Sequence, residues 1–287
     1  MVPAPMKPLA FITILRPANL LILGLAVGLG FWLGHAPGGA IACALLVAAA
    51  VCCAGFGNTV NDIADISTDS ISHPLRPLAK ADLSRKAAQF YAVFLALAAC
   101  ICAFLVSMPH FVGTVIPIVM LLLYAKFFKA TPLVGNVLVS MLVAYGILFG
   151  ALAGTGIHRL CVPALLAFLL NMCREIVKDV QDQQGDDAAG LITSASIARP
   201  ILKNIIALCG MAYALLVFLP WVRHDFGIAY AIVCIAVVAP LHIAWTFLLY
   251  KKDLAASSAG ISSLIKFELL AGLVALAADG FLTTIHF

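Results

Sequence analysis

The apolar run IACALLVAAAVCCAGF, residues 41–56, is followed after four residues by the polar stretch NDIADISTDSISHPLRP, residues 61–77. The run predicts a membrane-spanning helix, and the polar stretch places Asp62, Asp65 and Asp69 at positions i, i+3 and i+7. Residues at those offsets share one face of a helix. The sequence therefore predicts a stripe of carboxylates at the end of a membrane span.

A second polar stretch, REIVKDVQDQQGDD at residues 174–187, repeats this spacing with Asp179, Asp182 and Asp186. The two triplets begin 117 residues apart, and the two stretches together hold eight of the chain's 13 acidic residues. Charged side chains inside or beside membrane spans are energetically costly and usually serve function. The two acidic stretches are therefore the first place to look for a functional site.

The composition excludes an ordinary soluble domain. Of the 287 residues, 64% are hydrophobic and only 10% are charged, whereas about 25% charged residues is typical of soluble domains. A helix needs about 20 apolar residues to cross a bilayer. We expect an all-α polytopic membrane protein that forms a single domain over residues 1–287. The apolar segments predict nine spans, at residues 9–34, 40–64, 84–107, 110–127, 133–154, 159–180, 197–219, 226–249 and 260–284.

The distribution of Lys and Arg predicts the orientation of these spans. If the N-terminus is cytoplasmic, 15 of the 17 basic residues fall on the cytoplasmic side, and only Arg159 and Arg223 fall on the other. Cytoplasmic loops of membrane proteins carry an excess of Lys and Arg. We therefore expect an integral protein of the plasma (inner) membrane, with both acidic stretches on its cytoplasmic face.

Close carboxylates repel one another unless a cation neutralises them. Mg²⁺ prefers carboxylate oxygens and often shares its coordination with phosphate groups. Two acidic helices that face one cavity would thus hold Mg²⁺, and the metal would hold a diphosphate. Surface ion pairs with Arg76, Lys80 and Lys178 could account for one triplet, but two triplets of identical spacing favour the metal site.

The ordered motifs resemble those of the UbiA superfamily of intramembrane prenyltransferases. The first stretch reads NDxxDxxxD followed by IxxPxRP, and the second reads DxxDxxGD. LRPAN at residues 15–19 is similar to the family's opening RPxN, and YAKFFKATPLVGN at residues 124–136 is similar to its YxxxxK loop. The P-x-R-P ending and the form of the second stretch look most like the digeranylgeranylglyceryl phosphate synthase branch.

The resemblance implies Mg²⁺-dependent transfer of a polyprenyl group, geranylgeranyl in that branch, from its diphosphate to an acceptor. It implies that the metal is held by Asp62, Asp65, Asp179 and Asp182, with Asn58 or Asn61 as a neutral oxygen ligand. Arg76 and Lys129, with Lys126 as the alternative to Lys129, would neutralise the diphosphate. The isoprenoid tail would lie between apolar helices around a central cavity, where the ring of Tyr145 or Phe149 could face the carbocation. The remaining implied substrate-binding residues are Asn61, Asp69, Arg16, Asn19, Tyr124, Arg174, Lys178 and Asp186.

The acceptor is left open at this point. A glyceryl phosphate acceptor would need a second basic site, for which Lys7, Arg16, Arg85 and Lys86 are candidates. An aromatic acceptor such as a quinone or chlorin precursor, a cation-coupled transporter and a non-catalytic scaffold are the alternatives. The expected partners are the two substrates and membrane lipids, without nucleic acid, and the oligomeric state is open. Two polar residues within spans, His242 and Glu268, have no assigned role; Glu268 could pair with Lys266 or line the cavity.

Overall fold

The computed structural model describes residues 7–251 and 253–285. The helices and helical turns are, in order, α1 (Pro8–Thr13), α2 (Pro17–Leu33), α3 (Gly39–Ala64), α4 (Ile66–Ser72), α5 (Arg85–Val106), α6 (Met108–Leu123), the π-helical turn η1 (Tyr124–Phe128), α7 (Val134–Gly150), the 3-10 turn η2 (Ile157–Leu160), α8 (Cys161–Ala188), the 3-10 turn η3 (Ser194–Ser196), α9 (Arg199–Leu216), α10 (Leu219–Val222), α11 (Ile228–Val233), the π-helical turn η4 (Cys234–Val238), α12 (Ala239–Lys251) and α13 (Leu254–Ile285).

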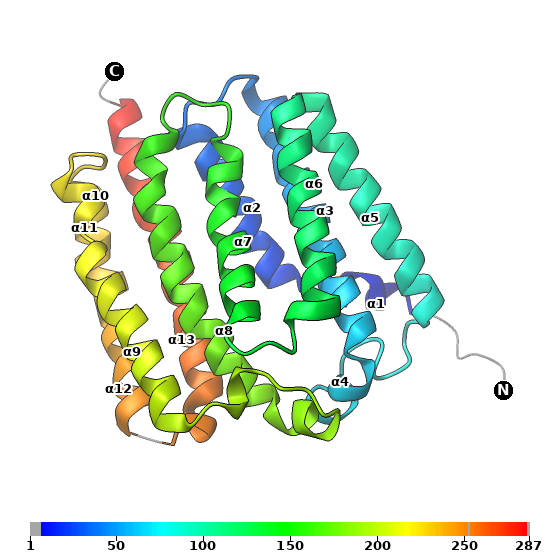
Figure 1. The fold of residues 1–287 in the computed structure, drawn as a ribbon. Coiled ribbons are helices and arrows are strands. Elements are labelled where there is room, and N and C mark those ends of the chain that lie inside the picture. The colour runs from blue at the N-terminus through cyan, green and yellow to red at the C-terminus, as the bar shows by residue number, and fades with distance from the viewer. Residues whose placement is uncertain (1–6, 252, 286–287) are drawn as a thin grey trace.

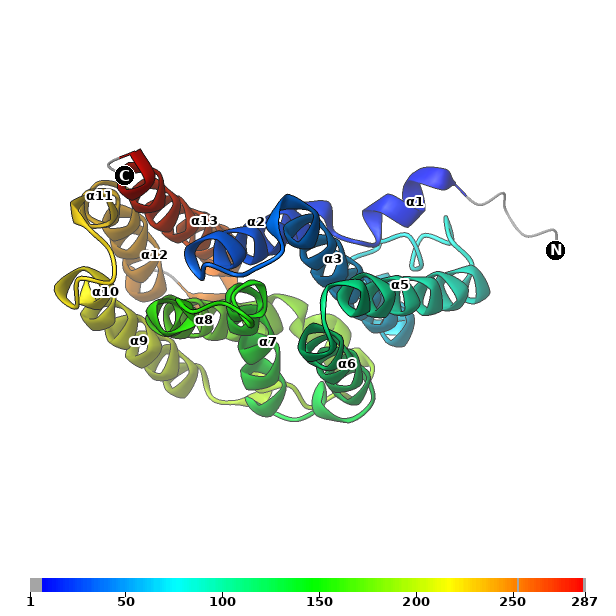
Figure 2. The same cartoon turned by 90° about the horizontal axis from the view of Figure 1, so that it is seen from above.

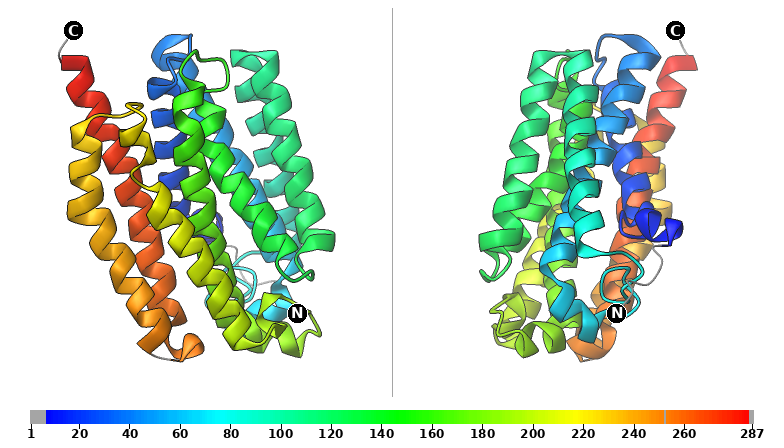
Figure 3. Two further views of the ribbon diagram at one scale, coloured as in Figure 1. Left: turned by 60° about the vertical axis from the view of Figure 1, so that its left-hand side comes forward. Right: turned by 90° about the vertical axis from the view of Figure 1, so that its right-hand side faces the viewer.

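The long helices run side by side as one bundle (Figures 1 and 3). Within the described residues, seven helical segments are long and apolar enough to cross a membrane, and α2 and α7 are two shorter apolar helices. Viewed from above, α2, α3 and α13 lie opposite α6, α7 and α8 (Figure 2). Large hydrophobic side chains such as Phe90, Leu215 and Ile243 are exposed on the outside of the bundle, as expected of a surface that faces lipid. The prediction of an all-α polytopic membrane protein is confirmed.

The first predicted span, residues 9–34, is wrong in one respect, because the structure divides it into α1 and α2. The break falls at Arg16, which has φ of 57°, directly before Pro17. Proline has no N–H to donate, and its ring disfavours the helical conformation in the residue before it. The break turns the Arg16 side chain onto the wall of the central cavity.

The spacing of the first acidic triplet predicts that its three residues lie on one helix, and this prediction is also wrong. The chain leaves helical geometry at Asp65, which has φ of −97° and ψ of 8°, so that Asp62 belongs to α3 and Asp69 to α4. The second triplet lies entirely on α8, as predicted.

Close helix approach is set by small residues where α2 crosses α7. A Cβ atom on Gly30 would overlap the carbonyl oxygen of Ile147, and one on Gly150 would overlap the carbonyl oxygen of Val27. Small residues at such crossings allow helix backbones to approach closely in membranes. These contacts hold together two helices that both line the cavity.

Candidate functional site

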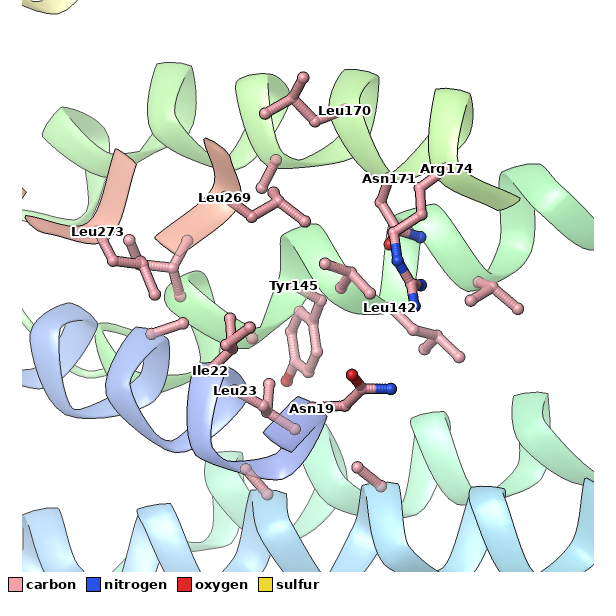
Figure 4. Close-up of a pocket in the computed structure, with 18 of the residues that line it drawn as sticks. Asn19, Ile22, Leu23, Leu142, Tyr145, Leu170, Asn171, Arg174, Leu269 and Leu273 are labelled. Atoms are coloured by element: carbon pink, nitrogen blue, oxygen red, sulfur yellow. The ribbon is translucent and has the colours of Figure 1, made fainter. Parts of the chain in front are cut away.

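A cavity of about 340 Å³ lies inside the bundle, lined chiefly by α2, α3, α6, α7, α8 and α13. Most of its wall is apolar, with side chains such as Leu23, Leu142 and Leu273. Figure 4 shows Asn19, Asn171 and Arg174 pointing into it together with the ring of Tyr145. The cavity can therefore hold a long apolar group whose polar end meets charged side chains.

Two arginines hold the carboxylates of the first acidic stretch. Arg16 Nη2 lies 2.5 Å from Asp62 Oδ1, and Arg76 Nη1 lies 2.5 Å from Asp69 Oδ1 and 3.6 Å from Asp62 Oδ1. Burial lowers the pKa of Arg76, but the hydrogen bond that Arg76 donates to Asp69 and the negative charges of Asp62 and Asp69 raise it, so that the pKa of Arg76 lies above its ordinary value. The Arg76 guanidinium thus stays charged beside these carboxylates.

Asp65, at the break between α3 and α4, pairs with Lys129. Lys129 directly follows the π-helical turn η1, which directs it toward the acidic stretch. Burial raises the pKa of the Asp65 carboxyl, and the charge of Lys129 only partly offsets that rise. Lys126 is exposed, with its Nζ 5.1 Å from the centroid of the Phe127 ring. Of the two lysines that the sequence left open, the structure brings Lys129 to the carboxylates.

The second acidic triplet is held by partners from three other segments. Asp179 accepts hydrogen bonds from Asn136 Nδ2 at 2.9 Å and from the Ser194 amide at 3.3 Å. His73 Nε2 lies 2.7 Å from Asp182 Oδ1, and Asp186 is hydrogen-bonded by Thr193. The sequence reasoning missed Asn136, Ser194 and His73 as members of this site. Its only available signal was that each is a polar residue within or beside a recognised motif.

Direct contact between α4 and α8 brings the two acidic stretches together. Ser72 Oγ donates to the Asp182 carbonyl oxygen at 3.2 Å and accepts from the Gly185 amide at 3.1 Å. A Cβ atom on Gly185 would lie 2.6 Å from the Thr68 carbonyl oxygen, so glycine permits this approach. The structure therefore places both acidic stretches at one end of the bundle, where α4 lies in Figure 1.

The other predicted substrate-binding residues lie on or beside the cavity. Asn58 Nδ2 donates to the Leu15 carbonyl oxygen at 2.8 Å, and Asn61 Nδ2 donates to Asp65 Oδ2 at 2.7 Å. The hydroxyl of Tyr145 donates to the Gly113 carbonyl oxygen at 3.0 Å, which leaves its ring to face the cavity. The cavity wall includes Arg16, Asn19, Asn58, Asn61, Tyr124, Tyr145, Phe149, Arg174 and Lys178.

The basic residues suggested for a second anion do not converge. Lys7 Nζ pairs with Asp82 Oδ1 at 2.7 Å, outside the cavity, and Arg85 and Lys86 are exposed in the first turn of α5. Arg16 alone lines the cavity, and Asp62 already holds it.

Glu268 belongs to a buried polar cluster in the cavity wall rather than to an ion pair with Lys266. Its side chain is fully buried, and its Oε1 lies 3.0 Å from His242 Nδ1. Its Oε2 accepts from Trp245 Nε1 at 2.6 Å. Buried carboxylates are stabilised by such hydrogen bonds, so the cluster ties α12 to α13.

The donor atoms fit Mg²⁺ of the kind that is shared with a substrate. The described residues contain no group of three or more His, Cys, Asp and Glu side chains that could hold a metal unaided. Mg²⁺ is commonly held by one or two carboxylates together with substrate phosphates. The buried Oδ1 of Asn61 has no hydrogen-bond partner, and Asn61 lies beside Asp65, to which its Nδ2 donates, so Asn61 offers a further oxygen near this carboxylate. The site is therefore suited to a metal that arrives with a diphosphate.

Residues 20–266 match the UbiA prenyltransferase family. The chain belongs to this family. As a UbiA prenyltransferase it is an enzyme and an integral membrane protein. It is 36% identical over 224 residues to digeranylgeranylglyceryl phosphate synthase of Thermococcus gammatolerans, covering 77% of this chain and 80% of that one. It is 32% identical over 236 residues to the enzyme of the same name from Methanopyrus kandleri, covering 82% and 87%.

Solved structures share the fold of this UbiA prenyltransferase. A structure described as digeranylgeranylglyceryl phosphate synthase in membranes superposes with a TM-score of 0.74 at 24% identity, covering 94% of this chain and 97% of that chain. A UbiA homologue from Archaeoglobus fulgidus, bound to GPP and Mg²⁺, gives a TM-score of 0.61 at 18% identity, covering 93% and 99%. These likenesses extend the confirmed family membership to the arrangement of the helices.

Proposed function

We propose that the protein transfers a geranylgeranyl group from its diphosphate to the free hydroxyl of geranylgeranylglyceryl phosphate, with Mg²⁺, and so forms an ether lipid. The observation that carries the proposal is the convergence of both acidic stretches, with Arg76 and Lys129, at one end of an apolar cavity. The names of the relatives support the choice of acceptor. We propose further that residues 1–287 work as one domain, because helices far apart in the chain, among them α2, α3, α8 and α13, line the same cavity.

The donor diphosphate is proposed to lie between the two acidic stretches. Asp62, Asp65, Asp179 and Asp182 would hold Mg²⁺ with Asn58 or Asn61. The presence of GPP and Mg²⁺ together in a solved UbiA homologue supports a metal that is shared with a prenyl diphosphate. When bound, the metal would neutralise the negative charge on the leaving diphosphate. Arg76 and Lys129 are proposed to add positive charge at the same group, because each already pairs with a carboxylate of this site. Asp69 and Asp186 hold the surrounding segments through Arg76 and Thr193.

In the proposed reaction the bond between C1 of the prenyl group and the diphosphate oxygen breaks, and a bond between C1 and the acceptor oxygen forms. Diphosphate and the hydroxyl proton are released. The apolar cavity wall excludes water from the allylic cation, which water would otherwise capture. The ring of Tyr145 faces the cavity and is placed to offer a cation–π contact.

The proposed location is the plasma membrane, with the N-terminus and both acidic stretches on the cytoplasmic side. The asymmetry of Lys and Arg supports this orientation. A membrane-impermeant thiol reagent applied to intact cells provides the test, with single cysteines introduced at exposed Ala81 and exposed Thr155 in a cysteine-free background. We expect only the cysteine at position 155 to be labelled. Labelling of only the cysteine at position 81 would show that the protein has the opposite orientation in the membrane.

The reaction is tested with purified protein, radiolabelled geranylgeranyl diphosphate and two acceptors offered separately, geranylgeranylglyceryl phosphate and 4-hydroxybenzoate. We expect product from the first acceptor only, with none in EDTA or for Asp62→Ala. If product forms only from 4-hydroxybenzoate, the protein is a prenyltransferase but its acceptor is aromatic rather than geranylgeranylglyceryl phosphate. Failure to consume the diphosphate with either acceptor would refute the proposed reaction.

A further inference from the structure

A basic patch lines the cavity and is separate from the contacts that hold the two aspartate triplets. It consists of Arg174 and Lys178 on α8 and Lys266 on α13, all on the cavity wall. Arg174 Nη1 lies 2.9 Å from Glu175 Oε1, and Lys178 Nζ lies 3.2 Å from Glu175 Oε2. Figure 4 shows the Arg174 side chain extending from α8 into the cavity beside Asn171. Glu175 therefore serves two cations of the patch at once.

The patch carries more positive charge than its carboxylate neutralises. Lys266 lies close enough to Arg174 for their like charges to interact, and no ion pair joins Lys266 to any residue that the structure describes. The other carboxylate on the cavity wall, Glu268, is bonded to His242 and Trp245. Uncompensated charge within a membrane protein is costly. The cavity thus has a surplus of positive charge that an anion would offset.

One donor atom of the patch is also unused. Arg174 Nε is buried and has no hydrogen-bond partner in the structure. A buried donor without a partner loses the hydrogen bonds that water would give it. A guanidinium presents a planar fork of N–H groups that matches the oxygens of a phosphate. The unused donor and the surplus charge therefore point to the same class of ligand.

We propose that Arg174, Lys178 and Lys266 bind the phosphate monoester of the acceptor lipid, at a site separate from that of the donor diphosphate. The proposal rests on the proposed function and names the residues that would select a phosphorylated acceptor. In this proposal, Arg174, Lys178 and Lys266 form the second basic site for which Lys7, Arg85 and Lys86 were candidates from the sequence.

The spacing of the two anion sites suits the reaction. On α8, Lys178 and Arg174 precede Asp182 by four and eight residues, which corresponds to about 6 and 12 Å at 1.5 Å per residue. At the moment of transfer, a path of seven or eight bonds joins the nearer phosphorus of the donor to the phosphorus of the glyceryl phosphate, through prenyl C1 and the acceptor oxygen. This path is roughly 10 Å long when extended, at ~1.5 Å per bond. A lipid whose phosphate binds the patch can therefore present its hydroxyl to the prenyl C1.

The test compares geranylgeranylglyceryl phosphate with geranylgeranylglycerol, which lacks only the phosphate. For Lys266→Gln we expect KM for the phosphorylated acceptor to rise about tenfold, as for loss of one charge-assisted hydrogen bond. KM for the donor and the kinetics with geranylgeranylglycerol should not change. Lys266→Arg should keep most of the affinity, and Lys86→Gln, at the exposed start of α5, is the matched control. Arg174→Gln provides a second variant, for which we also expect KM to rise for the phosphorylated acceptor but not for geranylgeranylglycerol.

Acceptor binding by calorimetry without donor separates this inference from the proposed function. If the wild-type protein transfers a prenyl group to the phosphorylated acceptor but Lys266→Gln and Arg174→Gln leave its KM unchanged, the proposed function stands and the phosphate site is refuted. If there is no transfer to either acceptor, the proposed function fails. The site then stands only if the wild-type protein binds the phosphorylated lipid more tightly than geranylgeranylglycerol and Lys266→Gln removes that preference. Equal binding of the two lipids refutes the site.

Discussion

Nε2 of His73 lies 2.7 Å from Oδ1 of Asp182, a contact that joins residues 109 positions apart in the chain. His73 follows α4, and Asp182 belongs to the second acidic triplet on α8. The relationship links the segment that carries Asp69 and Arg76 to the helix that carries Asp179. It therefore helps to set the distance across which a diphosphate would bind.

Replacement of His73 tests this link. We expect His73→Ala to lower kcat/KM for the prenyl diphosphate by about tenfold, because a hydrogen bond to a charged group contributes roughly 1.5 kcal/mol. His73→Asn retains an N–H donor and should lose less. Steady-state prenyl transfer measures both variants, and wild-type kinetics in His73→Ala would show that the contact does not support the site.

Gly185 permits the close contact of α4 with α8. Gly185→Leu is expected to lower activity by more than about tenfold, because its side chain would push α4 away from α8 and separate the acidic stretches. Gly28→Ala is the matched control, since its Cβ would meet only Val47 Cγ2 at 3.9 Å. Activity and detergent-solubilised thermal stability are measured together. Full activity in Gly185→Leu would contradict the structural role.

Lys129 and Lys126 lie in the same segment, so the effects of replacing each lysine can be compared directly. We expect Lys129→Gln to reduce prenyl transfer at least a hundredfold, because the buried Asp65 loses its charge partner and the diphosphate loses a cation. Lys126→Gln should stay within about twofold of wild type, since exposed charges contribute little. Initial rates at saturating acceptor decide the matter. A larger loss in Lys126→Gln would assign the role to the other lysine.

Removal of divalent cations should abolish activity without unfolding the protein. The carboxylates of the first triplet pair with Arg or Lys, and those of the second triplet accept hydrogen bonds, so each carboxylate is already stabilised in the free site. We expect EDTA to change Tm by less than about 2 °C while product formation stops. Fluorescence-monitored melting and the radiolabel assay on one sample provide the comparison. A large fall in Tm would mean that the metal is structural.

Loss of Glu268 should chiefly affect stability. Glu268→Ala leaves His242 and Trp245 without their shared acceptor in a buried position, a change expected to cost about 3 kcal/mol. Glu268→Gln keeps an acceptor oxygen and should cost less. Thermal unfolding in detergent measures both, and equal stability of Glu268→Ala and wild type would show that the cluster does not hold α12 to α13.

Much of the architecture could be predicted because the bilayer imposes a strong pattern on sequence. Apolar segments located the spans, and the spacing of Asp179, Asp182 and Asp186 placed them correctly on one helix. The breaks at Arg16 and Asp65 were missed, because hydropathy averages over a window and does not report single-residue dihedral angles. Partners such as Asn136 lie far away in the chain, and their contacts arise only when helices pack.

The first acidic stretch carries its own positive counterions in the resting structure. Arg16, Arg76 and Lys129 act as resident counterions for Asp62, Asp69 and Asp65. In the proposed reaction, a diphosphate that enters with its own cations would exchange partners with these pairs, so the total charge in this part of the membrane would change little. The original pairs could form again when the product diphosphate leaves. Re-formation of these pairs would therefore compete with product binding and favour turnover.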